Sequence, residues 1–144
     1  MKVENRHRTI RLPLEEIRRA ARLALRRVGR PRAEVAIRLL SDSAMRSLNR
    51  KFHGRDEATD CLAFYYDEEK RRGALRGHVG DIAISLDRAR VNARRWHEPF
   101  RREVRRYVVH GILHLAGFRD RGPGRSRMLR VQEEILDRSD ELTT

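Results

Sequence analysis

The longest helical pattern in the sequence ends in two histidines and an aspartate, and this segment constrains the chain more than any other. Apolar side chains recur at helical spacing from Phe100 to Ala116, which predicts one amphipathic helix over this range. His110 and His114 are four residues apart, so they lie on one helix face, about 6 Å apart along the axis. Both imidazoles can therefore reach a single ion.

Gly117 and Asp120 complete a metal-binding pattern, HxxxHxxGxxD. A glycine three residues after His114 can take a positive φ and turn the chain sharply, so that a side chain three positions further returns toward the ion. The pattern supplies two neutral nitrogens and one carboxylate oxygen, and it leaves a fourth position for water, as in catalytic zinc sites. We expect one zinc-class ion held by His110, His114 and Asp120, with water as the nucleophile.

Zinc proteases share the spacing of the two histidines, so a metallopeptidase-like hydrolase is one alternative. In those enzymes a glutamate directly follows the first histidine and acts as general base. This chain has Gly111 at that position. The sequence therefore argues against peptide hydrolysis by the usual route.

The rest of the chain predicts alternating strands and helices. An edge strand is expected within 3–12, a helix over 14–27 with an arginine-rich outer face, and a strand over 34–40. Ser41 or Asp42 offers an N-cap for a helix that ends at Gly54. Strands over 61–66 and 79–85 should pair across the charged stretch 67–77, and further helices are expected over 86–96 and 126–136.

The charge of the chain favours a polyanionic partner. Lys and Arg number 34 against 21 Asp and Glu, which gives a formal net charge of +13. RNA or DNA is the natural partner for such an excess.

The length of 144 residues suits a single domain spanning 1–144. The single cysteine, Cys61, excludes an intrachain disulfide and a Cys-rich zinc ribbon. With no apolar stretch long enough to cross a bilayer, we expect a cytoplasmic protein without membrane contact.

Three ordered motifs resemble the YbeY family of bacterial endoribonucleases and ribosomal-RNA maturation factors. Residues 110–120 read HGILHLAGFRD, where the family has HGxLHLxGYDH. Residues 48–64 read LNRKFHGRDEATDCLAF and resemble its LNxxYRGKDxxTDVLSF segment, and residues 79–85 read VGDIAIS, similar to its LGDIVIS strand. The similarity covers roughly residues 34–136.

The resemblance implies an α+β fold, with a small mixed four-stranded sheet packed with about five helices and the metal in a cleft at the end of the ligand helix. It also implies a zinc-dependent, single-strand-specific endoribonuclease that acts in ribosomal-RNA maturation and ribosome biogenesis. RNA, in the form of ribosomal RNA or ribosomal particles, would be its partner. A ribosome-associated assembly factor with little nuclease activity is the second reading, because the family's arginine and a general base are missing.

The departures from the family motifs define further candidate residues. Asp120 stands where the resemblance places a third histidine, and it follows Arg119 where the family usually has aspartate. His53 aligns with an arginine thought to face the substrate, and Arg55 falls on the neighbouring lysine position. We take His53 and Arg55 as candidate catalytic residues, with a surface loop residue without a role as the alternative for His53.

Three single residues and one helix face have both a functional and a structural interpretation. Arg106 precedes His110 by one turn and could bind a phosphate oxygen or be one of many solvated arginines. Asp60 and Asp81, at the starts of predicted strands, could orient an imidazole or simply cap a turn. The basic face of the first helix would suit an RNA backbone or be a solvated face; its members are Arg18, Arg19, Arg22 and Arg26.

Overall fold

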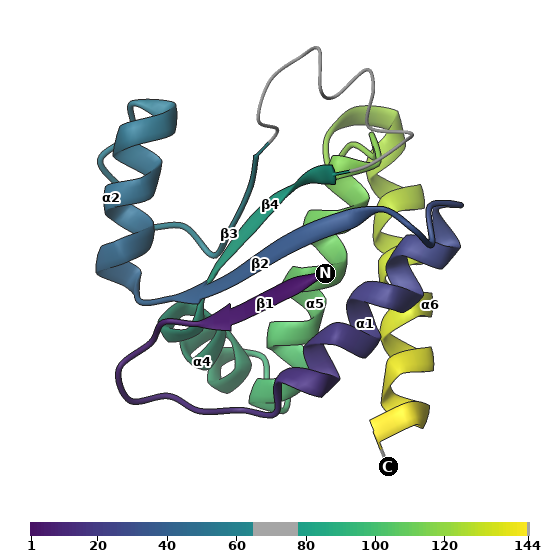
Figure 1. Ribbon diagram of the computed structural model, residues 1–144, viewed down its shortest axis with the longest axis horizontal. Helices are drawn as coiled ribbons and strands as arrows, with labels where there is room; N and C mark the ends of the chain where they lie inside the picture. The colour runs from purple at the N-terminus through teal and green to yellow at the C-terminus, as the bar shows by residue number, and fades with distance from the viewer. Residues whose placement is uncertain (65–77, 144) are drawn as a thin grey trace.

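A four-stranded mixed sheet forms the centre of the molecule (Figure 1). The computed structural model describes residues 1–64 and 78–143. The strands run in the order β1, β2, β4, β3, in which β1, β2 and β4 are parallel and β3 is antiparallel to β4. Their bounds are β1 Lys2–Asn5, β2 Glu34–Leu40, β3 Cys61–Phe64 and β4 His78–Ser85.

Helices cover both faces of this sheet. The described helices are α1 Leu14–Arg27, α2 Asp42–His53, α4 Leu86–Arg95, α5 Phe100–Leu115, a 3₁₀ turn η2 Gly122–Gly124 and α6 Arg125–Thr143. The helix α5 packs against the sheet and against α1, α4 and α6, so it lies at the centre of the helical layer (Figure 1). The helix α2 stands apart from this layer and packs on β4.

The alternation of side chains along the strands produces two cores. Ile82 and Ile84 of β4 face the main core, which the α1, α5 and α6 side chains fill. Ala83, between them, faces the opposite way and packs with Leu40 and with Met45 of α2. Both faces of the sheet are therefore covered, and the expected α+β architecture with five helices is confirmed for the described residues.

Local signals placed most helix ends correctly. The Ser41 side chain accepts a hydrogen bond from the Ala44 N–H at 3.2 Å, which is the N-cap expected for α2. That helix ends where Gly54 takes φ 68°, a conformation that costs glycine little. The antiparallel pairing of β3 with β4 is also as expected. The predicted end of the first of these strands, Tyr66, and the stretch 67–77 lie outside the described residues.

Two predicted ends were wrong. The first strand ends at Asn5, because the Asn5 side chain accepts from the His7 N–H and donates to the Ile10 carbonyl, both at 2.9 Å, and turns the chain. The last helix runs to Thr143 and not to Leu136. Its final turns are held by ion pairs to α5, which an apolar pattern cannot reveal. Among the described residues, no helix is long and apolar enough to cross a membrane.

Candidate metal centre

The helix α5 brings the two histidines of the motif together. The Nε2 atoms of His110 and His114 lie 3.0 Å apart, and their rings are nearly perpendicular, with an interplanar angle of 81°. Both side chains are partly exposed, His110 at 26% and His114 at 32%. The opposite face of α5 carries Val108, Ile112 and Leu115 into the core, which fixes the rotation of the helix about its axis. The predicted one-turn spacing therefore places the two Nε2 atoms side by side on one face of α5.

A Schellman motif ends α5 and returns the chain toward the histidines. The Gly117 N–H bonds to the His114 carbonyl at 3.0 Å, and the Phe118 N–H bonds to the Leu113 carbonyl at 2.9 Å. Gly117 has φ 97°, the positive value that this motif requires. Asp120 then approaches with Oδ2 at 3.3 Å from His114 Nε2 and 3.9 Å from His110 Nε2.

These three residues form a possible metal site. One donor atom from each of His110, His114 and Asp120 lies within 4.8 Å of the other two. Two imidazole nitrogens and a carboxylate oxygen suit zinc and other divalent transition metals. The two Nε2 atoms lie 3.0 Å apart with the Asp120 carboxylate 3.3 Å from His114 Nε2, so the three groups are close enough to share one cation. The residues present therefore fit a catalytic metal with three protein ligands.

Gln132 of α6 orients the first histidine. Its Oε1 lies 2.8 Å from His110 Nδ1, and its Nε2 donates to Glu133 Oε2 at 3.3 Å. Because the amide oxygen can only accept, Nδ1 carries the imidazole proton and the lone pair lies on Nε2, toward Asp120 and His114. Gln132 is 4% exposed. Such a buried partner fixes both the tautomer and the ring orientation of a metal ligand.

Sequence reasoning missed Gln132 and named Asp60 and Asp81 as candidates for this role, beside a simple capping of turns. The Asp60 side chain accepts from the Cys61 N–H at 2.8 Å, and Asp81 lies 3.3 Å from Arg38 on the neighbouring strand. A signal for Gln132 was present, because it occupies an inward position of α6, four residues after buried Met128. A polar residue on an apolar helix face needs a polar partner.

Burial lowers the pKa of His110 below the usual value for histidine. The hydrogen bond to Gln132 and the charge of Asp120 oppose this shift, and the neighbouring His114 adds to it. The neutral imidazole, which is the form that binds a metal, is thereby favoured. The protein environment thus prepares His110 as a ligand.

A hollow of about 510 Å³ opens beside the second and third ligands. It is bounded by the end of α5, the turn after it and η2, and it gives a substrate room to approach the ligand atoms. Two arginines, Arg119 and Arg121, flank it with positive charge. The other lining residues are His114, Phe118, Asp120, Gly122, Pro123 and Gly124. This hollow confirms the expected cleft at the end of the ligand helix.

The structure places His53 and Arg55 outside the metal-ligand group. His53 is the last residue of α2, and its ring stacks on Phe64 with centroids 5.5 Å apart and an interplanar angle of 26°. Arg55 is exposed and lies 3.8 Å from Glu57. The Phe64 side chain packs with the second core, on the face of the sheet that α2 covers. His53, stacked on Phe64, therefore belongs to this face, opposite the main core that α5 fills.

Arg106 does not point free toward a substrate. Its guanidinium lies 2.7 Å from Glu98, 3.0 Å from Glu103 and 3.0 Å from Glu133, and it is about four-fifths buried. Desolvation lowers the Arg106 pKa, but the hydrogen bonds that the guanidinium donates to these carboxylates outweigh it, so the pKa is raised. Arg106 is therefore neither a free phosphate ligand nor a solvated arginine, as the two interpretations had it, but a largely buried ion-pair residue.

Comparisons with known proteins agree with this geometry. The family model "Endoribonuclease YbeY" matches residues 2–140. A protein named endoribonuclease YbeY from an Anaeromyxobacter species is 35% identical over 142 residues, which cover 99% of this chain and 72% of that protein. One of the same name from Chloroflexus aggregans is 39% identical over 108 residues, which cover 72% of this chain and 71% of that protein.

A solved structure has the same arrangement of elements. The solution structure of TM1509 from Thermotoga maritima superposes on 88% of this chain and 80% of its own length. The TM-score is 0.65 and the sequence identity is 26%.

Proposed function

The chain belongs to the endoribonuclease YbeY family, and from this premise we propose that it is a zinc-dependent endoribonuclease that cleaves single-stranded RNA in the maturation of ribosomal RNA. The family is one of metal-dependent hydrolases. The observation that carries the proposal is the convergence of His110, His114 and Asp120 on one point beside an arginine-flanked hollow. Ribosomal RNA and ribosomal particles are the proposed partners, and the cytoplasm is the proposed location.

One zinc ion per chain would be held by His110 Nε2, His114 Nε2 and a carboxylate oxygen of Asp120. Bound there, zinc supplies the Lewis acidity that activates water and polarises a phosphoryl oxygen. Gln132 keeps His110 in the tautomer that offers Nε2. Asp120 in place of a third imidazole contributes a harder, negatively charged donor. Water bound to zinc at this site would therefore be less acidic than at a site with three histidines.

The arginines that flank the hollow would hold the RNA backbone. Arg119 and Arg121 border the same hollow as His114 and Asp120. A guanidinium binds phosphate oxygens in a bidentate manner and stays charged at every physiological pH. The net charge of +13 adds long-range attraction for a polyanion. These features support RNA as the substrate class.

His53 and Arg55 remain candidate catalytic residues in this proposal. His53 stacks on Phe64 at the end of β3, the edge strand of the sheet. In that position it would contact a phosphate when protonated or exchange a proton with the substrate. Arg55 is exposed and would contact the backbone by charge.

The packing of Gly111 disfavours the peptidase alternative. A Cβ added to Gly111 would lie 2.9 Å from a methyl carbon of Ile82 in β4. The position that carries the general-base glutamate in zinc proteases is therefore turned against the sheet and has no space for a side chain.

The test is cleavage of a labelled single-stranded RNA by the zinc-loaded protein, beside the same RNA in a duplex. We expect cleavage of the single strand, loss of cleavage after treatment with a chelator, and loss in His114→Ala and Asp120→Ala. His97→Asn is the matched control, because His97 is exposed, lies outside the ligand group and has φ 54°, which asparagine tolerates. Tight RNA binding without cleavage would overturn the nuclease proposal and favour a ribosome assembly factor.

A further inference from the structure

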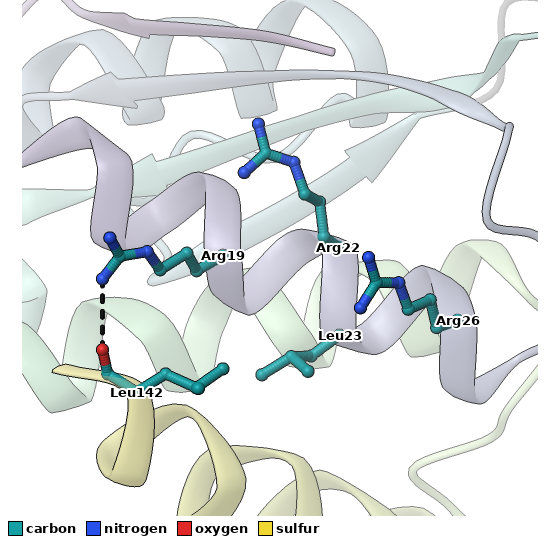
Figure 2. A pocket seen from close by; sticks show the side chains of 5 residues that line it. All are labelled: Arg19, Arg22, Leu23, Arg26 and Leu142. Carbon is teal, nitrogen blue, oxygen red and sulfur yellow. Dashed lines mark hydrogen bonds between the residues drawn. The ribbon is translucent and has the colours of Figure 1, made fainter.

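A second basic hollow lies away from the ligand group, between α1 and the end of α6. Arg19, Arg22 and Arg26 line it together with Leu23 and Leu142 (Figure 2). In Figure 2 the Leu23 and Leu142 side chains extend toward each other between the two helices, with Arg19 and Arg26 on either side of them and the Arg22 guanidinium pointing away. The volume of this hollow is about 390 Å³. No carboxylate is among its described lining residues.

The hollow continues along the same two helices. A neighbouring hollow of about 310 Å³ shares Leu23 and Arg26 with the first and adds Arg27 and Arg138. From Arg19 to Arg26 the helix rises roughly 10 Å. Ile135 contributes to the apolar floor, and Glu134 is the acidic member, paired with Arg27 at 3.2 Å. The two hollows thus form one arginine-lined groove.

Part of the charge in this groove is available to a ligand, whereas Arg138 pairs with Glu141 and Arg27 with Glu134. Arg26 is exposed and makes no ion pair with any residue that the structure describes. Arg22 pairs with Glu15 at 3.1 Å, but both side chains are about half exposed, so water and salt weaken the pair. Arg19 donates to the Leu142 carbonyl at 3.1 Å and thereby fixes the end of α6 (Figure 2). A solvated helix face would not by itself require a concave surface with an apolar floor.

We infer that this groove binds the phosphodiester backbone of the RNA at a distance from the metal ligands. This inference rests on the proposed function, because it takes RNA as the substrate. Arg22 and Arg26 would contact phosphates, and the exposed edge of Leu142 would contact ribose or base. Arginine side chains that track a backbone beside an apolar surface are typical of single-strand binding grooves.

The helix α6 connects this groove to the metal centre. Gln132, which holds His110, and Ile135 and Leu142, which line the groove, belong to the same helix. Gln132 and Leu142 are ten residues apart, which corresponds to roughly 15 Å along the axis. Only an RNA long enough to reach from the groove to the metal ligands can contact both sites. A very short oligonucleotide would contact the ligand group alone.

The test compares two double variants that remove the same charge. Arg22→Gln with Arg26→Gln changes the groove, and Arg90→Gln with Arg94→Gln removes two exposed arginines at the same spacing from α4. Arg22→Lys with Arg26→Lys keeps the charge of the groove. Binding of a fluorescent single-stranded RNA of about 20 nucleotides is measured by anisotropy over a salt series with the full zinc-loaded chain.

We expect the groove variant to bind this RNA about tenfold more weakly at moderate salt, with a salt slope smaller by about 1.4. The α4 control and the lysine variant should stay within about twofold of the parent protein. The KM for the long RNA should rise in the groove variant while cleavage of a tetranucleotide is unchanged. Circular dichroism and urea unfolding show whether each variant is folded, and the exposure of Arg22 and Arg26 predicts that it is.

Two results would overturn the inference and leave the proposed function intact. In one, the groove variant binds and cleaves long RNA as the parent does. In the other, the groove and α4 variants lose the same affinity, so that only total charge matters. A parent protein that neither binds nor cleaves RNA would instead refute the proposed function itself.

Discussion

The Nδ1 atom of His110 and the Oε1 atom of Gln132 lie 2.8 Å apart, so a helix remote in sequence sets the tautomer of the first candidate ligand. Gln132→Leu fills a similar volume but removes the acceptor. We expect zinc affinity to fall by about tenfold, because the imidazole loses its fixed tautomer and orientation. Competition with a fluorescent zinc chelator measures the change.

Gln132→Glu is the control for this prediction, since a carboxylate keeps an acceptor oxygen at the same place. Its zinc affinity should remain near that of the parent protein. Equal affinity in the leucine variant and the parent would show that Gln132 does not act on the ligand. A fall in both variants would point to packing and not to hydrogen bonding.

Substitution of the ligands should separate the three donors. His114→Ala and Asp120→Ala each leave two donors and should lose bound zinc during dialysis against a weak chelator, whereas the parent keeps about one ion per chain. Asp120→His supplies a third imidazole at the family position and should retain zinc, with tighter binding of softer metals. Elemental analysis measures the content. Zinc retained in His114→Ala would place the ion elsewhere.

Gly111→Ala should destabilise the protein, although alanine is the better helix former. The new Cβ would lie 2.9 Å from Ile82, which is fully buried and cannot move away freely. We expect a loss of about 1 to 2 kcal/mol in the free energy of unfolding, after the gain in helix propensity is subtracted. Urea unfolding measures it, and an increase in stability would show that the contact between α5 and the sheet is loose.

The Glu98 carboxylate should make stability depend on pH in the acidic range. Its hydrogen bond with Arg106 holds the Glu98 pKa below the ordinary value of 4.5. A lowered pKa in the folded state contributes stability above 4.5, and this contribution is lost as the pH falls through the lowered pKa. Glu98→Gln should therefore be less stable than the parent at neutral pH, with a difference that shrinks in acid.

Urea unfolding at neutral and acidic pH measures this difference. Glu57→Gln is the matched control, because Glu57 is exposed and lies 3.8 Å from Arg55. The control should follow the parent at every pH. A Glu98→Gln curve that stays parallel to the parent curve down to strongly acidic pH would contradict the assignment.

Elements defined by local signals could be predicted from the sequence, whereas those set by contacts between helices could not. Pro13 and Gly54 mark their helix ends by backbone geometry alone, and α1 and α2 were placed correctly. The last turns of α6 depend on Arg102 and Arg105, which reach Asp140 at 2.8 and 2.6 Å from another helix. No periodic pattern within 137–143 encodes those partners.

The same distinction holds at the candidate site. His110, His114 and Asp120 are joined by one helix and one turn, so their spacing alone predicts their meeting. Gln132 and the glutamates around Arg106 come from segments that approach through the fold. A single sequence shows that such residues are polar, but it does not show which residues they contact in the fold.

The turn at Gly117 divides the candidate site into two parts. One part is fixed on a helix, and the other lies on a stretch of chain that a bound ion would restrain. His110 and His114 are fixed by α5, whereas Asp120 follows a glycine with φ 97° in a partly exposed stretch that leads to η2. An ion bound by all three residues would link His114 to Asp120 through metal coordination. The chain between them would then form a closed loop, held against the helix. Occupancy of the site and order of the 117–124 segment are then thermodynamically linked, so the protease resistance of this segment should rise with metal loading.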